Sequence, residues 1–223
     1  MTVDRMTVLS SMIEQGVIPV FYHPEVEVCE KVIQACADGG AKCVEFTNRG
    51  EFAAHVFYEA ARHFAKADPS VIMGVGSVVD APTAGLYIAN GAKFVVGPIL
   101  NAEIAKLCNR RKVAYSPGCG SATEIANAEE LGCEIVKVFP GGSVGGPDFV
   151  KSILGPTPWT KIMPTGGVDA TEESLTKWFK AGVACVGIGS NLIAKPLLEA
   201  KDYAGIARKV GETIALIRKI RGK

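Results

Sequence analysis

Lys137 is a charged residue in an otherwise apolar run, 135–139, which is predicted to be a strand. Because side chains alternate along a strand, Lys137 shares a face with Ile135 and Phe139. A desolvated lysine loses its proton readily and becomes a nucleophile for carbonyl carbon. Two structural interpretations remain open: a lysine whose ammonium reaches solvent at the strand end, or a buried ion pair.

Glu45 interrupts a second apolar segment, 43–47, on the same face as Cys43 and Thr47. A carboxylate inside a protein needs a cationic partner or a chemical role, and Lys137 is a candidate for both. Arg49 follows at the strand exit, where its guanidinium can bind an anion through two hydrogen bonds. A purely structural Glu–Lys or Glu–Arg pair is the alternative.

Two glycine-containing loops, 164–168 and 187–191, have the composition of anion-binding sites. Gly166, Gly167 and Ser190 can supply backbone and hydroxyl donors to a phosphate, since glycine lets a ligand approach the backbone closely. Ordinary turns would have the same composition. A third loop, 141–147, is either a flexible connection or a lid or ligand loop.

The elements that must position these residues alternate along the chain. Eight short apolar runs, each bounded by glycine or proline, predict strands near 17–21, 43–47, 71–77, 94–97, 113–116, 135–139, 161–165 and 184–188. The segments between them have helical spacing. This alternation predicts an α/β fold, a (β/α)8 TIM barrel whose active site lies at the carboxyl ends of the strands.

Helical spacing is clearest in three places. Apolar residues recur at Phe52, Val56, Ala60 and Phe64; at Leu175, Trp178 and Phe179; and at Tyr203, Ile206, Val210, Ile214 and Ile217. An extra N-terminal helix, about 4–15, is predicted to end at Gly16. No linker or composition shift divides the chain, so we expect one barrel domain over 1–223.

Composition excludes several classes of protein. The 223 residues carry 24 Lys+Arg and 23 Asp+Glu, without the basic excess of a nucleic-acid or membrane-surface binder. The seven cysteines are odd in number, form no CxxC pair and lie partly in apolar runs. Because the opening residues also lack the apolar core of a signal peptide, we expect a cytoplasmic protein with reduced thiols.

Other candidate residues are weaker. Cys119 follows the fifth strand, but strand alternation brings no histidine near it, so we do not favour it as a nucleophile. His23, His55 and His63 are scattered. No cluster of histidines and carboxylates has metal-ligand spacing, so we expect no metal.

In combination, five motifs resemble the 2-keto-3-deoxy-6-phosphogluconate (KDPG) and 4-hydroxy-2-oxoglutarate (KHG) aldolase family. They occupy 45–49, 74–77, 137–140, 164–167 and 187–190, and the resemblance runs from about Val8 to Asp202. It implies a class I aldolase, free of metal and other cofactors, that acts on a small keto acid and is a homotrimer. The expected products are pyruvate and an aldehyde, glyceraldehyde 3-phosphate from KDPG or glyoxylate from KHG.

The resemblance also implies roles for individual residues. Lys137 is similar to the Schiff-base lysine and Glu45 to the general acid/base. Arg49, with Ser77 where the family usually has threonine, resembles the site for the pyruvate carboxylate. Phe139 resembles the wall beside the imine and Thr165 a contact to the aldehyde half, while Gly166, Gly167 and Ser190 resemble the phosphate site.

This sequence departs from the family pattern around the pocket mouth. Gly141-Gly142 stands where the family often has Ala-Glu after the proline, and the fifth-strand loop carries Ser121 where threonine is usual. These changes leave the choice of aldehyde open. Two other functions also remain possible: a phosphate-binding barrel isomerase or synthase without imine chemistry, and a non-catalytic ligand-binding barrel.

Overall fold

The computed structural model describes residues 3–222. Its parallel strands are β1 (Val17–Phe21), β2 (Cys43–Thr47), β3 (Ile72–Gly76), β4 (Phe94–Val96), β5 (Ala114–Ser116), β6 (Gly118–Cys119), β7 (Val136–Val138), β8 (Ile162–Pro164) and β9 (Val186–Ile188). Its helices are α1 (Arg5–Gln15), α2 (Val26–Asp38), α3 (Ala53–Ala67), α4 (Ala81–Ala89), α5 (Ala102–Arg111), α6 (Ala122–Glu130), α7 (Gly146–Leu154), α8 (Glu172–Lys180), α9 (Lys195–Glu199) and α10 (Tyr203–Arg221). Strands occur at all eight predicted positions, most within two residues of the predicted limits.

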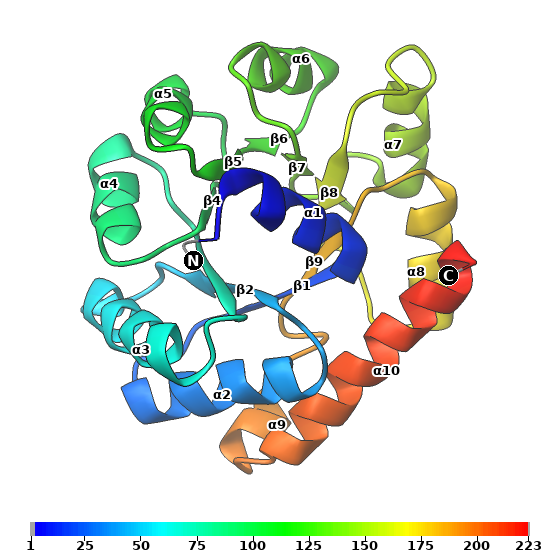
Figure 1. Ribbon diagram of the computed structural model, residues 1–223. Helices are drawn as coiled ribbons and strands as arrows, with labels where there is room; N and C mark the ends of the chain where they lie inside the picture. Colours follow the sequence, from blue (N-terminus) through cyan, green and yellow to red (C-terminus); the bar gives the residue numbers. More distant parts are fainter. Residues whose placement is uncertain (1–2, 223) are drawn as a thin grey trace.

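The strands form two parallel sheets at the centre of the molecule, and the helices other than α1 lie around them (Figure 1). A six-stranded sheet has the order β5-β4-β3-β2-β1-β9, and a three-stranded sheet has the order β6-β7-β8. The fifth predicted strand continues after Ser116 as β6, and the interruption is Pro117, which has no backbone N–H to donate to a sheet. A single bridge between Thr165 and Gly187 connects the end of β8 to β9.

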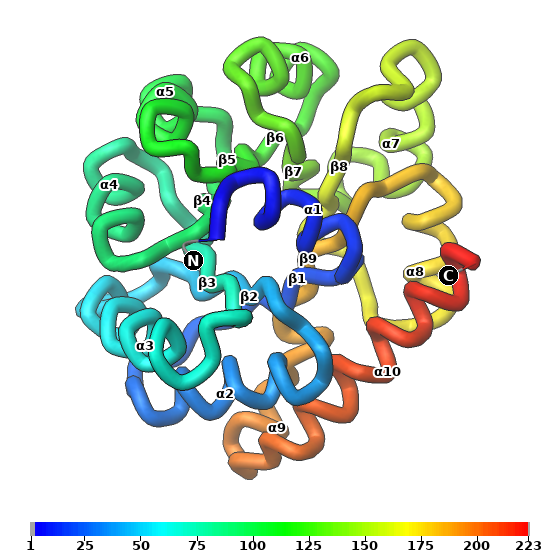
Figure 2. Tube along the Cα trace, in the orientation of Figure 1, coloured from blue at the N-terminus to red at the C-terminus, as the bar shows by residue number. Residues whose placement is uncertain are grey.

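Helix α1 lies across one end of the strands, as the tube in Figure 2 also shows. The side chain of Asp4 accepts a hydrogen bond from the Thr7 amide and caps its start. Gly16, in a left-handed conformation with φ 81°, ends it as predicted. On its buried face, Val8, Leu9 and Met12 contact the inner face of the strands.

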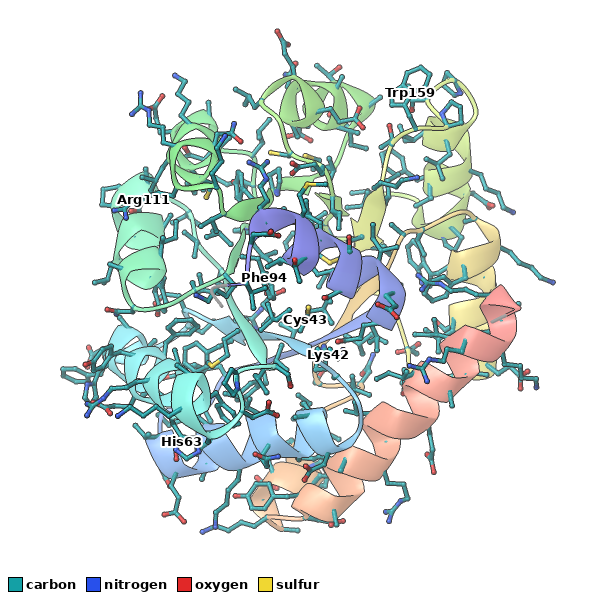
Figure 3. All side chains as sticks on the ribbon, in the orientation of Figure 1. Lys42, Cys43, His63, Phe94, Arg111 and Trp159 are labelled. Carbon is teal, nitrogen blue, oxygen red and sulfur yellow. The ribbon has the colours of Figure 1, made fainter. Side chains whose placement is uncertain are left out.

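Two apolar clusters fill the molecule. The larger lies between the strands and the outer helices. The smaller lies on the other face of the strands, which we call the inner face. It contains residues of α1 and residues in or next to most strands: Val8, Leu9, Met12, Ile18, Cys43, Ile72, Phe94, Val96, Ala114, Ile135, Met163 and Cys185. Figure 3 labels two of its members, Cys43 and Phe94, near the centre, and Trp159 at the periphery.

One residue of the predicted helical stripes lies elsewhere. Phe52 precedes α3 in a left-handed conformation, φ 59°, and its side chain is 80% exposed. Its spacing to Val56 satisfied the helical pattern, but the helix begins one residue later, so its side chain does not share the buried face. The other stripes, on α8 and α10, are confirmed.

Candidate active site

Lys137 is on the inner face of β7. Ile135, two residues before it, belongs to the inner cluster, and the Lys137 side chain is only 6% exposed. Its Nζ lies 4.6 Å from the centroid of the Phe139 ring. The lysine therefore does not reach solvent at the strand end, which removes one of the two structural interpretations.

Glu45 is equally buried, on β2. Its residue exposure is 1%, and no described residue donates a hydrogen bond to its Oε2. The carboxylate occupies space left free by Gly76 on the adjacent strand, because a Cβ at that position would overlap Oε1. A buried carboxylate oxygen without a partner is costly in a folded protein, which points to a ligand or a chemical role.

The pKa values of these two groups shift toward their neutral forms. Burial raises the pKa of Glu45, and the cations Lys137 and Arg49 oppose this only in part. Burial lowers the pKa of Lys137, which Glu45 opposes and Arg49 reinforces. No ion pair within 4.0 Å joins the two side chains in the described part of the chain. The lowered pKa of Lys137 favours the neutral amine that nucleophilic attack requires, and the raised pKa of Glu45 suits a group that transfers protons.

Arg49 lies directly after β2, at the exit predicted for it. Its Nε donates a hydrogen bond to Ser77 Oγ at 3.2 Å, which brings together the two residues expected to hold a carboxylate. Ser77 itself has a left-handed backbone, φ 61°. Asn48, the residue before Arg49, accepts a 2.8 Å hydrogen bond from the hydroxyl of the buried Tyr87.

A cavity of about 540 Å³ opens at the carboxyl ends of β1, β2, β7, β8 and β9. It brings together six of the nine residues predicted for the site: Arg49, Phe139, Thr165, Gly166, Gly167 and Ser190. Lys137 and Glu45 are buried residues of two of these strands, and Ser77 joins the group through its hydrogen bond with Arg49. This is the end of the strands where the sequence predicted the site.

Thr165, like Glu45, has a buried side-chain oxygen without a hydrogen-bond partner in the described part of the chain. Its Oγ1 is buried and has no hydrogen-bond partner among the described residues. Gly187 on the neighbouring strand leaves room for it, since a Cβ there would lie 2.5 Å from Oγ1. The hydroxyl is thus available to a ligand in the cavity.

The first two residues of the 141–147 loop are hydrogen-bonded to the loop that follows β8. The amide of Gly141 donates to Thr165 O and that of Gly142 donates to Gly166 O, both at 2.9 Å. A Cβ at Gly141 would lie 2.8 Å from Gly166 O. The glycine pair at this departure from the family pattern therefore lets the loop pack against the predicted phosphate-binding loop.

Cys119 is not a suitable nucleophile. It is 1% exposed, and burial raises the pKa of its thiol to about 12. No histidine lines the cavity, and the described residues contain no group of three or more potential metal ligands.

Among the other residues that line the cavity are three polar ones that the sequence analysis did not assign to the site: Tyr22, Thr47 and Lys195. Thr47 shares the inner face of β2 with Glu45, a signal the alternation pattern contained. Tyr22 immediately follows β1, but Lys195 begins the short helix α9, and no pattern in the sequence marks it.

These features together are typical of an enzyme that acts on an anionic carbonyl compound. The desolvated lysine and carboxylate suit the carbonyl, and the arginine and the two glycine loops at the cavity suit the anionic groups. The family model described as KDPG and KHG aldolase matches residues 8–209. The chain therefore belongs to the KDPG and KHG aldolase family, and it is a carbon–carbon lyase.

Individual relatives agree with this assignment. The chain is 30% identical over 218 residues to a 2-dehydro-3-deoxy-phosphogluconate aldolase of Haemophilus influenzae, covering 98% of this chain and 100% of the relative. It is 29% identical over 198 residues to the KHG/KDPG aldolase of Escherichia coli, covering 89% and 90% of the two chains. A KDPG aldolase structure from Legionella pneumophila, with pyruvate captured as a covalent carbinolamine, superposes with a TM-score of 0.83 at 25% identity and covers 93% and 96%. Among residues 3–222, no helix is long and apolar enough to cross a membrane.

Proposed function

We propose that this chain is a class I aldolase that cleaves KDPG to pyruvate and glyceraldehyde 3-phosphate, and that it also cleaves KHG to pyruvate and glyoxylate. The observation that carries the proposal is the burial of Lys137 opposite a carboxylate that lacks a hydrogen-bond partner on Oε2. The names of the relatives from H. influenzae and E. coli support the two substrates. The carbinolamine in the L. pneumophila relative supports imine chemistry.

Lys137 is the nucleophile in this proposal. Its neutral amine attacks the C2 carbonyl of the substrate, and the carbinolamine loses water as Glu45 supplies a proton to the leaving hydroxyl. The resulting protonated imine is an electron sink. The downward shift in the pKa of Lys137 makes its neutral form available, and the upward shift in the pKa of Glu45 makes its proton available.

Glu45 then acts as a base. Its carboxylate takes the proton of the C4 hydroxyl, the C3–C4 bond breaks, and the bonding electrons move to the imine to give the enamine of pyruvate. The aldehyde leaves. Protonation of C3 and addition of water to the imine release pyruvate and restore the lysine. General acid/base catalysis of this kind contributes about 10²–10⁴-fold to the rate.

The remaining residues bind the two ends of the substrate. Arg49 and Ser77 hold the pyruvate carboxylate, Phe139 forms the wall beside the imine, and Thr165 contacts the aldehyde half. Gly166, Gly167 and Ser190 bind the phosphate. All of these residues except Ser77 line one cavity, and Ser77 is hydrogen-bonded to Arg49. These positions and the unpaired hydroxyl of Thr165 support the assignments.

We further propose that residues 1–223 form one domain, a closed (β/α)8 barrel with α1 as an additional N-terminal helix. Two features support closure. Only Pro117 separates β5 from β6, and the bridge between Thr165 and Gly187 joins the other edges of the two sheets. Closure leaves no exposed sheet edge.

The enzyme is proposed to be a metal-free cytoplasmic homotrimer that acts without a cofactor. Imine formation supplies the electron sink that a metal supplies in other aldolases. Four exposed apolar residues support self-association: Phe52, Val79 and Ile99, which follow β2, β3 and β4, and Leu86 on α4. All seven cysteines are free and buried, as in a reducing compartment. Light scattering measures the subunit number, and activity after EDTA treatment tests the absence of a metal.

Trapping with borohydride tests the proposed function. Incubation with pyruvate and borohydride should add one reduced pyruvyl group per chain, on Lys137. Lys137→Met, which keeps the length of the side chain but not the amine, should give no adduct and no turnover. The exposed Lys161 should stay unmodified, which makes it an internal control. An adduct on another lysine, or none, would favour the isomerase, synthase or binding-barrel alternatives.

A further inference from the structure

Four consecutive backbone carbonyls beside the cavity accept hydrogen bonds from other segments. Those of Thr165 and Gly166 accept from the amides of Gly141 and Gly142. That of Gly167 accepts from the indole Nε1 of Trp178 at 3.2 Å, and that of Val168 accepts from Asn191 Nδ2 at 3.4 Å. Each of these peptide planes is therefore anchored at its oxygen.

Anchoring an oxygen also fixes the direction of the next amide. In a trans peptide, the N–H points away from the C=O of the same plane. The N–H groups of Gly166, Gly167 and Val168 are thus directed away from Gly141, Gly142 and the Trp178 indole. None of these three amides donates to another described residue, and all three residues line the cavity. Three adjacent unpaired donors are suited to an anion.

The Gly167–Val168 peptide differs from the two peptides before it in the group that binds its oxygen. Its oxygen is bound by a side chain rather than by the backbone of a neighbouring loop. Gly167 has φ 78°, and it lies between the substrate cavity and a second cavity of about 280 Å³ whose lining includes Trp178. Glycine allows a wide range of backbone angles, and this peptide borders a cavity on each side. The hydrogen bond from the indole therefore restricts the rotation of the peptide.

We propose that Trp178 is a positioning residue for phosphate binding, a role that rests on the proposed function. Its ring is 2% exposed in the packing of α8 and does not line the substrate cavity. Its N–H holds the Gly167 carbonyl, and this directs the Val168 amide toward the phosphate of the substrate. Trp178 therefore acts through the backbone and touches no substrate.

Trp178→Phe is the direct test, because phenylalanine keeps an aromatic ring in the core and removes the donor. KM for KDPG should rise about three- to tenfold, the effect of losing one ordinary hydrogen bond. Inorganic phosphate should become a weaker competitor by a similar factor. KM for KHG and trapping with pyruvate, neither of which involves a phosphate, should not change. The matched control is Trp159→Phe, since Trp159 is 67% exposed.

Fluorescence gives a second measurement that does not depend on turnover. The chain has two tryptophans, so Trp159→Phe leaves Trp178 as the single one. Titration of this variant with inorganic phosphate should change its emission with saturation. Equal changes in KM for KDPG and KHG after Trp178→Phe, no change in either, or no saturable phosphate response would overturn the proposal. Failure of wild-type trapping with pyruvate would instead contradict the imine mechanism, and the phosphate titration would still decide the role of Trp178.

Discussion

The carboxylate of Glu45 lies in the space where a side chain at Gly76 would be. The two residues are on adjacent parallel strands, β2 and β3, whose register pairs Glu45 with Gly74 and Thr47 with Gly76. A glycine at the end of β3 is therefore what allows a carboxylate to be buried on the inner face of β2. The catalytic geometry proposed here depends on a residue that itself has no functional group.

Gly76→Ala should displace the Glu45 carboxylate, since the new methyl group overlaps Oε1. We expect kcat to fall by about 10²-fold or more, the range for general acid/base catalysis, while pyruvate is still trapped on Lys137. Steady-state kinetics and mass spectrometry measure the two effects.

Gly85→Ala is the matched control for this change. Gly85 is inside α4, and a Cβ there would make an ordinary 3.7 Å contact with Leu107. Activity should be unchanged, and stability should rise by about 0.5–1 kcal/mol because alanine favours a helix interior. Normal turnover in Gly76→Ala would show that Glu45 tolerates displacement and is not the acid/base.

Glu45→Gln tests the carboxylate itself. The amide keeps the shape of the side chain but cannot exchange protons, so turnover should fall by at least about 10²-fold. The lysine still forms the bond to carbon, so borohydride trapping should remain detectable. A variant that turned over normally would reduce Glu45 to a structural partner of Lys137.

The pH dependence of trapping separates the two charges that act on Lys137. Trapping should increase as the amine loses its proton, with a midpoint below the ordinary lysine pKa because burial lowers the pKa of Lys137. Glu45 raises this pKa and Arg49 lowers it. The midpoint should therefore move to lower pH in Glu45→Gln and to higher pH in Arg49→Gln.

These rates are to be measured with saturating pyruvate, because Arg49→Gln is also expected to weaken binding of the carboxylate. Opposite shifts in the two variants would support the assigned surroundings of Lys137. Shifts of the same sign would contradict them.

The sequence predicted the strands and the shared interior of Lys137 and Glu45, because both follow from local patterns. Apolar runs bounded by glycine and proline located all eight strands, and alternation placed Lys137 with Ile135, which the inner cluster contains. The split of the fifth strand at Pro117 also has a local cause, although we had not predicted it.

Contacts between distant segments were beyond the reach of such patterns. The space that Gly76 leaves for Glu45, the hydrogen bond of Tyr87 with Asn48, and that of Trp178 with Gly167 join residues on different elements. The stripe on α8 correctly placed Trp178 in the core. The acceptor for its indole N–H, the Gly167 carbonyl, depends however on the position of the 165–168 loop, which the local pattern does not give.

Ser190→Asp tests whether the site distinguishes a phosphorylated from an unphosphorylated substrate. Ser190 is exposed at the cavity edge after β9, so a carboxylate can be accommodated there without repacking the core. Gly167 is unsuited to this purpose: its φ is 78°, and a Cβ would lie 2.8 Å from Gly142 Cα, so any larger residue would strain the loop.

The negative charge introduced by Ser190→Asp should repel a phosphate within a few ångströms and raise KM for KDPG at least about tenfold. KHG ends in a carboxylate attached to C4 and does not extend to the phosphate position, so its KM should change much less. Ser10→Asp on α1, at the opposite end of the strands, is the control for added charge and should leave both values unchanged. Equal increases for KDPG and KHG would show that Ser190 does not contact a phosphate, and an unphosphorylated keto acid would then be the better substrate.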